Sequence, residues 1–221
     1  MADIGIQYES VARGDLDLML MAWLPGTHRD YWARVRDRVL DLGPMYTGQL
    51  GWIVPDYVPR DVLNSVDQLR DAELAARFDN RVQGIDPGSG LNQASLQALK
   101  RYDLEHVDLV ASSSAAMAAV LSRAIDEKRW MIATSWTPHW MFARFDLRFL
   151  EDPEGVFGGT ERIHAVARPY LDRRRPEVTA FLSRFHLPDQ DLDGLLLQSQ
   201  DDSPEAAVEH YLNQNPERVR Y

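Results

Sequence analysis

The chain contains no cysteine among its 221 residues. A disulfide framework, a thiolate metal site and a thiol nucleophile are therefore excluded. The chain also lacks an excess of positive charge, because 24 basic residues stand against 34 acidic ones and give a formal net charge of -10. This balance argues against a surface for duplex nucleic acid, so we expect no nucleic-acid partner.

Long apolar runs are missing as well. No stretch reaches the roughly 18 residues that a membrane-spanning helix needs. Residues 1–5 have neither a basic region nor a long apolar segment, so we expect no signal peptide in the sequence as given. What is present is an ordinary balance of 45% hydrophobic and 26% charged residues, which excludes a disordered or fibrous chain.

Short apolar runs alternate with helical patterns along the chain. The patterns predict strands at 16–22, 51–54, 82–86, 107–111, 130–135 and 163–168, and helices at 2–13, 29–42, 65–78, 91–102, 112–128 and over most of the chain beyond 169. Strands separated by helices favour parallel sheets that are covered on both faces. Two such runs followed by a helical tail predict an α/β protein with two lobes.

Two of the helix starts carry local signals. Ser65 and Gln68 have the spacing of a capping box. Thr137 and Pro138 are expected to open a helix, with a capping hydroxyl followed by a proline at the first helical position. In open α/β sheets ligands bind outside the carboxyl ends of strands. The candidate site residues are therefore those that directly follow strands.

The first such strand end is the segment from Trp23 to His28. An indole and an imidazole lie five residues apart on a loop that contains proline and glycine. Both side chains can face a cleft from such a loop. The plainer alternative is an aromatic residue that anchors the loop beside a surface histidine, and the residues alone leave both interpretations open.

The second strand end is the segment from Asp86 to Leu91, which contains Gly88 and Gly90. Glycines between a strand and a helix let the backbone approach a ligand, and the free N–H groups of a helix start attract an anion. Neither a P-loop nor a complete G-x-G-x-x-G pattern is present, so both phosphate and carboxylate remain possible ligands. A plain tight turn explains this stretch equally well.

The third strand end is the segment from Ser135 to Trp140. The predicted strand places Trp136 at its carboxyl end, and the following helix carries His139 and Trp140 in its first turn. A helix start is polar and partly exposed, and two tryptophans there exceed what a core needs. We assign Trp140 to packing and Trp136 to a cleft.

Together these strand ends offer indole faces and a helix start that can bind a carboxylate. This combination suits a zwitterion with a quaternary ammonium group, because such a cation has no N–H to donate and is recognised by aromatic faces. Its carboxylate would accept hydrogen bonds from the backbone near Gly90 and Leu91 and from His28.

The same segments resemble the substrate-binding proteins of ABC importers for glycine betaine, proline betaine and choline. The resemblance covers essentially the whole chain. Its motifs are Ala22-Trp23-Leu24-Pro25-Gly26-Thr27-His28, Gly84-Ile85-Asp86-Pro87-Gly88-Ser89-Gly90 and Trp136-Thr137-Pro138-His139-Trp140-Met141-Phe142, together with Ser113-Ser114-Ala115-Ala116-Met117 and Leu150-Glu151-Asp152-Pro153.

The resemblance implies a type II periplasmic-binding-protein fold, in which two lobes with mostly parallel sheets close on a ligand. One lobe is expected to hold residues 1–79 and 162–221, and the other residues 80–161. The family holds the ammonium group in a cage of three tryptophans, two of which map to Trp23 and Trp136. By the same resemblance, the ligand carboxylate would meet Gly90, Leu91 and His28.

The resemblance also implies what the protein works with. The partners would be an ABC permease and its ATPase, and the chain would act in the periplasm or on the extracellular face of the cytoplasmic membrane, in osmoprotection. No cofactor, metal or catalytic residue is expected. An enzyme that uses His28 with Asp30, or His139, is disfavoured because no H-E-x-x-H spacing and no serine elbow accompany these residues.

One part of the family pattern has no counterpart in the sequence, namely the first strand-helix unit with the third cage tryptophan. Trp32 and Trp52 match helix and strand-interior positions instead. We therefore expect an incomplete first lobe with an open strand edge, and a homo-oligomer that covers this edge is a hypothesis. The alternatives to betaine capture are a choline-preferring binding protein, a sensory module of the same fold and a fragment that binds nothing.

Overall fold

A seven-stranded sheet system runs through the computed structural model, which describes residues 4–219 of the chain. The strands follow the spatial order β1-β7-β2-β5-β3-β4, and β6 pairs with β2. Their bounds are β1 (Leu18–Leu24), β2 (Leu40–Pro55), β3 (Arg81–Gln83), β4 (Asp108–Val110), β5 (Ile132–Thr137), β6 (Leu147–Phe149) and β7 (Glu161–Ala167). The mixed α/β class expected from the sequence is confirmed.

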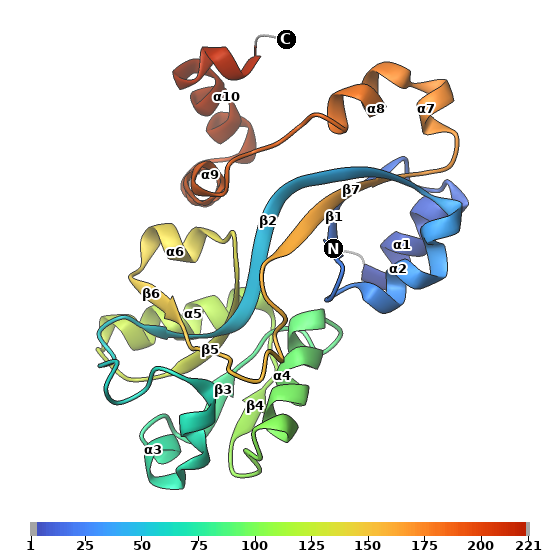
Figure 1. Cartoon of the computed structure of the whole chain (residues 1–221). Coiled ribbons are helices and arrows are strands. Elements are labelled where there is room, and N and C mark those ends of the chain that lie inside the picture. Colours follow the sequence, from blue (N-terminus) through green and yellow to red (C-terminus); the bar gives the residue numbers. More distant parts are fainter. Residues whose placement is uncertain (1–3, 220–221) are drawn as a thin grey trace.

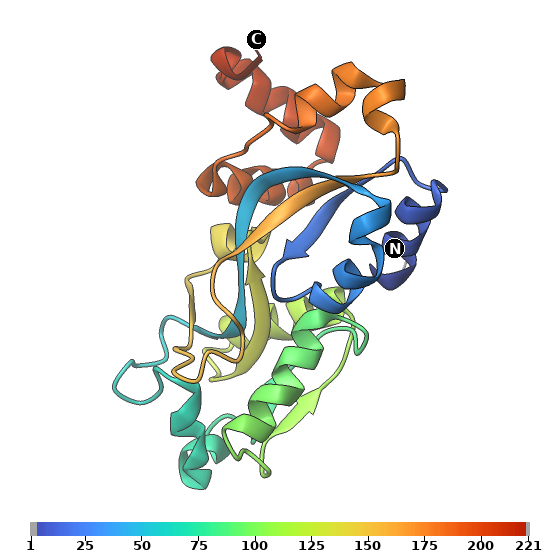
Figure 2. The same cartoon turned by 45° about the vertical axis from the view of Figure 1, so that its right-hand side comes forward.

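The helices cover the two ends of this sheet system (Figures 1 and 2). Their bounds are α1 (Ile4–Arg13), α2 (Arg29–Val35), α3 (Ala72–Ala76), α4 (Gly90–Arg101), α5 (Ser114–Asp126), α6 (Trp140–Arg144), α7 (Leu171–Arg174), α8 (Pro176–Leu182), α9 (Asp189–Asp201) and α10 (Pro204–Gln214), with short 3-10 helices at η1 (Arg36–Arg38), η2 (Val66–Arg70) and η3 (Pro216–Val219). Within residues 4–219, no helix has the length and apolar character needed to cross a membrane.

Strand β2 connects the two lobes. Its first part, Leu40–Gly48, pairs with β7, whereas its second part pairs with β5 from Gln49 onward and then with β6. Figure 1 shows β2 running from the lobe of α1 and α2 to the lobe of β3 and β4. The pairing partner changes between Gly48 and Gln49, so the chain passes from one lobe to the other at this point.

The two lobes have separate hydrophobic cores. Tyr8 and Val166 belong to the smaller core, under α1 and α2. Trp52 and Phe78 are buried in the larger core together with Val82, and thus pack with residues that follow the expected boundary at residue 79. We therefore propose that the lobe boundary lies at the crossing of β2 rather than at residue 79.

Parallel pairing is confined to one part of the sheet system, contrary to the expectation of mostly parallel sheets. Strand β3 pairs in parallel with β4 and β5, whereas the pairs β1–β7, β2–β7, β2–β5 and β2–β6 are antiparallel. Parallel neighbours need a crossover connection. Helix α4 connects β3 to its neighbour β4, and α5 connects β4 to β5, which lies on the other side of β3. Strands β2 and β7, which run between the lobes, are antiparallel neighbours and therefore need no crossover helix between them.

Three of the predicted helices differ from the structure by more than small shifts at their ends. The helix expected at 29–42 ends as an α-helix at Val35 and continues only as η1 to Arg38, because the chain from Leu40 pairs with β7. The capping box at Ser65 is present, but it opens the 3-10 helix η2, after which Asp71 caps α3 separately. Thr137 still pairs with Gln49 in β5, so the following helix α6 begins only at Trp140.

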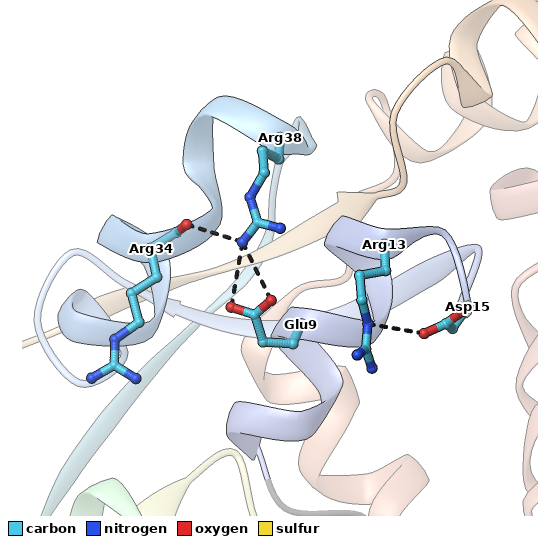
Figure 3. A network of polar contacts seen from close by, with 5 residues as sticks. All are labelled: Glu9, Arg13, Asp15, Arg34 and Arg38. Carbon is cyan, nitrogen blue, oxygen red and sulfur yellow. Dashed lines mark hydrogen bonds and ion pairs between the residues drawn. The ribbon is translucent and has the colours of Figure 1, made fainter.

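Polar contacts fix the outer helices of the smaller lobe. A guanidinium nitrogen of Arg38 lies 3.3 Å from both carboxylate oxygens of Glu9 and donates to the carbonyl oxygen of Arg34 (Figure 3). Arg13 forms an ion pair with Asp15 in the same region. These contacts are exposed, so each stabilises the helix pair only weakly. The buried rings of the smaller core, including Tyr8, are the stronger link between α1 and the sheet.

The helical tail reaches from one lobe to the other. The backbone N–H of Leu187 donates to the carbonyl oxygen of Met45 on β2, in the smaller lobe. Farther along, α9 packs on α6, where Asp193 accepts the backbone N–H of His139 and Asp201 pairs with Arg144. The tail is therefore anchored in both lobes.

Candidate functional site

A closed loop joins β1 to α2 and carries two of the candidate residues. The backbone N–H of His28 donates to the carbonyl oxygen of Trp23 at 3.0 Å, and the backbone N–H of Trp23 donates to Nδ1 of His28 at 3.1 Å. The Trp23 side chain is half-buried, and His28 is only 7% exposed. This burial excludes the interpretation of His28 as a surface histidine.

The surroundings of His28 fix its protonation state. Burial lowers the pKa of His28 to about 4, so the imidazole is neutral at pH 7. Nδ1 accepts the Trp23 N–H and lies 3.3 Å from the hydroxyl of Tyr8, whose own pKa is raised by burial and by the charge on Glu161. The proton of the neutral ring is therefore on Nε2. No residue within 4–219 accepts a hydrogen bond from this Nε2, which leaves it available to an added acceptor.

A second loop joins β5 to α6 and carries Trp136 and His139. Trp136 lies near the end of β5, opposite Leu50 of β2, and is half-buried. His139 caps α6, because its Nδ1 accepts the backbone N–H of Met141 at 3.2 Å. The His139 ring meets the indole of Trp136 edge-on, with 4.6 Å between ring centroids, and burial lowers the pKa of His139 to about 4. His139 is thus a neutral ring that supports Trp136.

The neighbouring Trp140 has a packing role, as the sequence predicts. Its ring lies 6.3 Å from Phe145 and 5.5 Å from His139, measured between centroids. The guanidinium carbon of Arg144 lies 5.4 Å from the centroid of the same indole. The Trp140 ring is therefore occupied by protein groups.

Gly48 brings the two loops together. A Cβ atom on Gly48 would lie 2.5 Å from Cη2 of Trp23 and 2.8 Å from the carbonyl oxygen of Thr137. Trp23 from one lobe and the residue after Trp136 from the other therefore approach the same point on β2. Only glycine leaves room for this approach. A glycine inside a strand marks such a contact in general. The strand predicted from the sequence in this region begins only at residue 51, so Gly48 has no strand pattern around it that would indicate the contact.

The start of α4 adds backbone donors beside the first loop. Ser89 caps this helix by accepting the N–H of Asn92 at 3.1 Å. The N–H groups of Gly90 and Leu91, at the first two positions of α4, have no acceptor among the described residues. A Cβ atom on Gly90 would lie 2.5 Å from the methyl carbon of Thr27, so the loop before His28 touches the start of α4.

Glu161 holds the tip of that loop, and the sequence analysis missed it. Its carboxylate accepts the N–H of Gly26 at 2.9 Å, the N–H of Thr27 at 2.9 and 3.1 Å, and the hydroxyl of Thr27. Glu161 is 5% exposed and lies 134 residues after Thr27. A contact across this sequence distance leaves no local motif, so no pattern in the sequence could have indicated it.

The structure thus places the five predicted site residues around one junction of the lobes. Trp23 and His28 lie on the β1–α2 loop. This loop touches the start of α4, where Gly90 and Leu91 lie. Trp136 lies on β5, and the end of this strand approaches Trp23 at Gly48. A cavity of about 510 Å³ beside this junction is lined by residues of both lobes, among them Thr27, Phe157 and Glu161. Of the five predicted site residues, Gly90 lines this cavity, whereas Trp23, His28, Leu91 and Trp136 do not.

The residues of the enzyme hypothesis are not brought together. Asp30 is exposed and lies 4.0 Å from Arg29, as an ion pair, with no contact to His28. Within the described part of the chain, no group of three or more His, Cys, Asp or Glu side chains is placed to hold a metal ion. The groups at the junction are aromatic faces, hydrogen-bond donors and the carboxylate of Glu161.

Two α/β lobes joined by crossing strands, with aromatic and donor groups at their junction, define the class of periplasmic binding proteins. Within this class, the chain belongs to the OpuAC family, the substrate-binding domain of ABC-type glycine betaine transport systems, which matches residues 1–214.

Relatives of known sequence and structure support this assignment. The glycine betaine/carnitine transport binding protein GbuC of Listeria monocytogenes is 37% identical over 150 residues, which make up 66% of this chain and 50% of GbuC. The chain thus matches about half the length of this relative. Lactococcal OpuAC, in its closed conformation with glycine betaine, has a TM-score of 0.89 and 33% identity over 99% of this chain and 84% of that one.

Two further structures show how widely the fold is shared. ProX of Borrelia burgdorferi, a glycine betaine and L-proline binding protein, has a TM-score of 0.87 and 30% identity over 99% of this chain and 82% of that one. An ABC-transporter choline binding protein in complex with choline has a TM-score of 0.83 at 22% identity, over 98% of this chain and 77% of that one, which shows the common fold alone.

Proposed function

We propose that this chain is the substrate-binding component of an ABC importer and captures glycine betaine or a related quaternary ammonium compound. The observation that carries the proposal is the convergence at Gly48, where Trp23 meets the strand end that bears Trp136. The membership in the OpuAC family and the likeness to lactococcal OpuAC support it.

Trp23 and Trp136 are the proposed walls for the ammonium group. A quaternary ammonium ion offers methyl groups with a diffuse positive charge, which the faces of indole rings attract. Both side chains are half-buried and pack against the larger core, although Trp23 stands on β1 of the smaller lobe and Trp136 on β5 of the larger one. Because their strands belong to different lobes, closure of the lobes would adjust the spacing between the two walls.

His28, Gly90 and Leu91 are the proposed donors for the ligand carboxylate. Neutral His28 has its proton on Nε2, and the helix start of α4 offers two N–H groups in a favourable dipole. Choline has a hydroxyl in place of the carboxylate and would leave part of these donors without a charged acceptor. We therefore expect a preference for betaines, and a preference for choline is the alternative.

The proposed partners are an ABC permease and its ATPase, and the proposed location is the extracytoplasmic side of the membrane. Strands β2 and β7 are adjacent where the chain crosses between the lobes, and we propose that they form the hinge. The closed, loaded form would then be the one that docks on the permease.

Self-association through β1 is a separate proposal. This strand lies at the edge of the sheet system, and Leu20 on it is 46% exposed. Open edges with apolar side chains are sites for pairing with another chain. Light scattering tests the idea, since a mass equal to one chain of 25.3 kDa would contradict it.

Isothermal titration tests the main proposal directly. We expect glycine betaine and proline betaine to bind more tightly than choline. Tighter binding of choline would support the choline-preferring alternative. Absence of binding for all three compounds would contradict the proposed function.

A further inference from the structure

The carboxylate of Glu161 lies at the point where the chain crosses between the lobes. Glu161 is the first residue of β7 and pairs in register with Gly48, the last residue of β2 that pairs in the smaller lobe. The cross-strand neighbour of Glu161 is thus Gly48, at which the β1–α2 loop and the β5–α6 loop meet. Any change in the direction of β7 at this point moves the Glu161 carboxylate.

Hydrogen bonds transmit this position to the loop before α2. The carboxylate accepts from two successive backbone N–H groups, those of Gly26 and Thr27, and from the Thr27 hydroxyl. Within residues 4–219, no cationic side chain forms an ion pair with Glu161, so these donors are what compensates the buried charge. Charge-assisted bonds of this kind are stronger and more directional than neutral ones.

The loop in turn contacts the other lobe. The methyl group of Thr27 rests against Gly90 at the start of α4, and the next residue along the loop is His28. His28 is tied back to Trp23 by the two reciprocal bonds, which close the loop and link its tip to both residues. The position of the loop tip therefore determines how His28 lies relative to Gly90 and Leu91.

We propose that Glu161 is a positioning residue that couples the hinge to the carboxylate half of the binding site. In this role Glu161 would act not by contact with the ligand but by holding the Thr27 tip against α4, which sets the geometry between His28 and the helix start. This inference rests on the proposed function, because it assigns a role within the same site. The preference for a carboxylate-bearing ligand would then depend on Glu161 as well as on the three proposed donors to the ligand carboxylate.

The test compares Glu161→Gln with the wild-type chain, using glycine betaine and choline as probes. Glutamine has nearly the same size, but it is neutral and has only one acceptor oxygen, so the charge-assisted bonds to Gly26 and Thr27 are weakened. We expect glycine betaine to bind about 10-fold more weakly and choline less than about 3-fold more weakly. The matched control is Glu9→Gln, an exposed carboxylate in the same lobe, which should change neither affinity.

Two further measurements separate positioning from a general loss of structure. In a His28→Ala background, Glu161→Gln should cost much less for glycine betaine, because Glu161 acts through His28. Amide hydrogen exchange at Gly26 and Thr27 should speed up in Glu161→Gln without ligand, while exchange in α5 stays unchanged.

The outcomes distinguish this inference from the proposed function. Three results would overturn the inference, namely equal losses of affinity for both ligands, full additivity with His28→Ala, or an unchanged affinity for glycine betaine. If the wild-type chain binds glycine betaine, each of these results still leaves the proposed function in place. A wild-type chain that binds neither probe would overturn both.

Discussion

The β1–α2 loop and the β5–α6 loop are built from the same parts. Each has a tryptophan near the end of a strand, a proline that follows a cis peptide bond, and a histidine directly before a helix, namely Trp23, Pro25 and His28 in one and Trp136, Pro138 and His139 in the other. Burial lowers the pKa of both histidines to about 4.

The loops differ in the backbone group that each histidine binds. Nδ1 of His28 accepts from Trp23, the residue behind it, whereas Nδ1 of His139 accepts from Met141, the residue ahead of it. His139 therefore caps a helix and lies against Trp136, and His28 closes its loop and keeps Nε2 for an added acceptor. Under the proposed function, this difference in hydrogen-bond partner would make His28 a donor to the ligand and His139 a support for Trp136.

The largest expected effect is the loss of an aromatic wall. Trp136→Ala should weaken glycine betaine and choline alike by about 100-fold, because both share the ammonium group. Trp130→Ala is the control, since this indole packs on Phe78 and Arg77 away from the junction. Titration of both variants checks the prediction, and unchanged affinity in Trp136→Ala would remove Trp136 from the ammonium site.

The contact between the two loops is tested by Gly48→Ala. The new methyl group would overlap Trp23 and a backbone carbonyl, so we expect a loss of about 1–3 kcal/mol in the free energy of unfolding and at least about 10-fold weaker binding of both ligands. Gly159→Ala is the control, because a Cβ there meets nothing within 4 Å. Denaturant unfolding and titration measure the two effects. A Gly48→Ala chain that behaves like Gly159→Ala would show that the loops do not share a tight contact.

The comparison of the histidines is tested by two alanine variants. His28→Ala should weaken glycine betaine by about 10-fold and choline much less, since only the carboxylate uses Nε2. His139→Ala should weaken both ligands by similar factors, because it acts through Trp136. Equal losses for both ligands in His28→Ala would remove the difference between the two loops.

The smallest effect is a pH dependence common to both loops. The folded chain keeps each histidine neutral down to about pH 4, whereas the unfolded chain takes up protons below about pH 6.5. The free energy of unfolding should therefore fall as the pH drops through this range, by about 1 kcal/mol per histidine between pH 7.5 and 5.5. Denaturation of His28→Asn and His139→Asn should each show a smaller pH dependence than wild type. An unchanged dependence in either variant would contradict the burial of that histidine.

The sequence predicts most of the elements in their order, but it misses β6 (Leu147–Phe149) and places several boundaries wrongly. Alternating strands and helices predicted the α4 and α5 crossovers, because hydrophobic periodicity is a local property. The sequence predicts only residues 51–54 of β2 as a strand, although β2 spans Leu40–Pro55. Its first part is a strand because β7 pairs with it, and this partner lies more than a hundred residues away.

The candidate site shows the same limit. Trp23, His28 and Trp136 follow strands and stand in conspicuous motifs, so the sequence could propose them. Glu161 and Gly48 act through contacts between distant segments, and neither stands out in its own surroundings. Which backbone N–H group each of His28 and His139 accepts likewise depends on the geometry of its loop, and residue types alone do not specify this geometry.

The crossing of β2 has a consequence for how the chain unfolds. One continuous strand contributes backbone hydrogen bonds to both lobes, so neither core can lose its sheet without disturbing the other. We therefore expect a single cooperative melting transition in spite of the two separate cores. A ligand bound at the junction would then raise the melting temperature of the whole molecule. A thermal-shift screen of quaternary ammonium compounds would thus report binding without any label at the site.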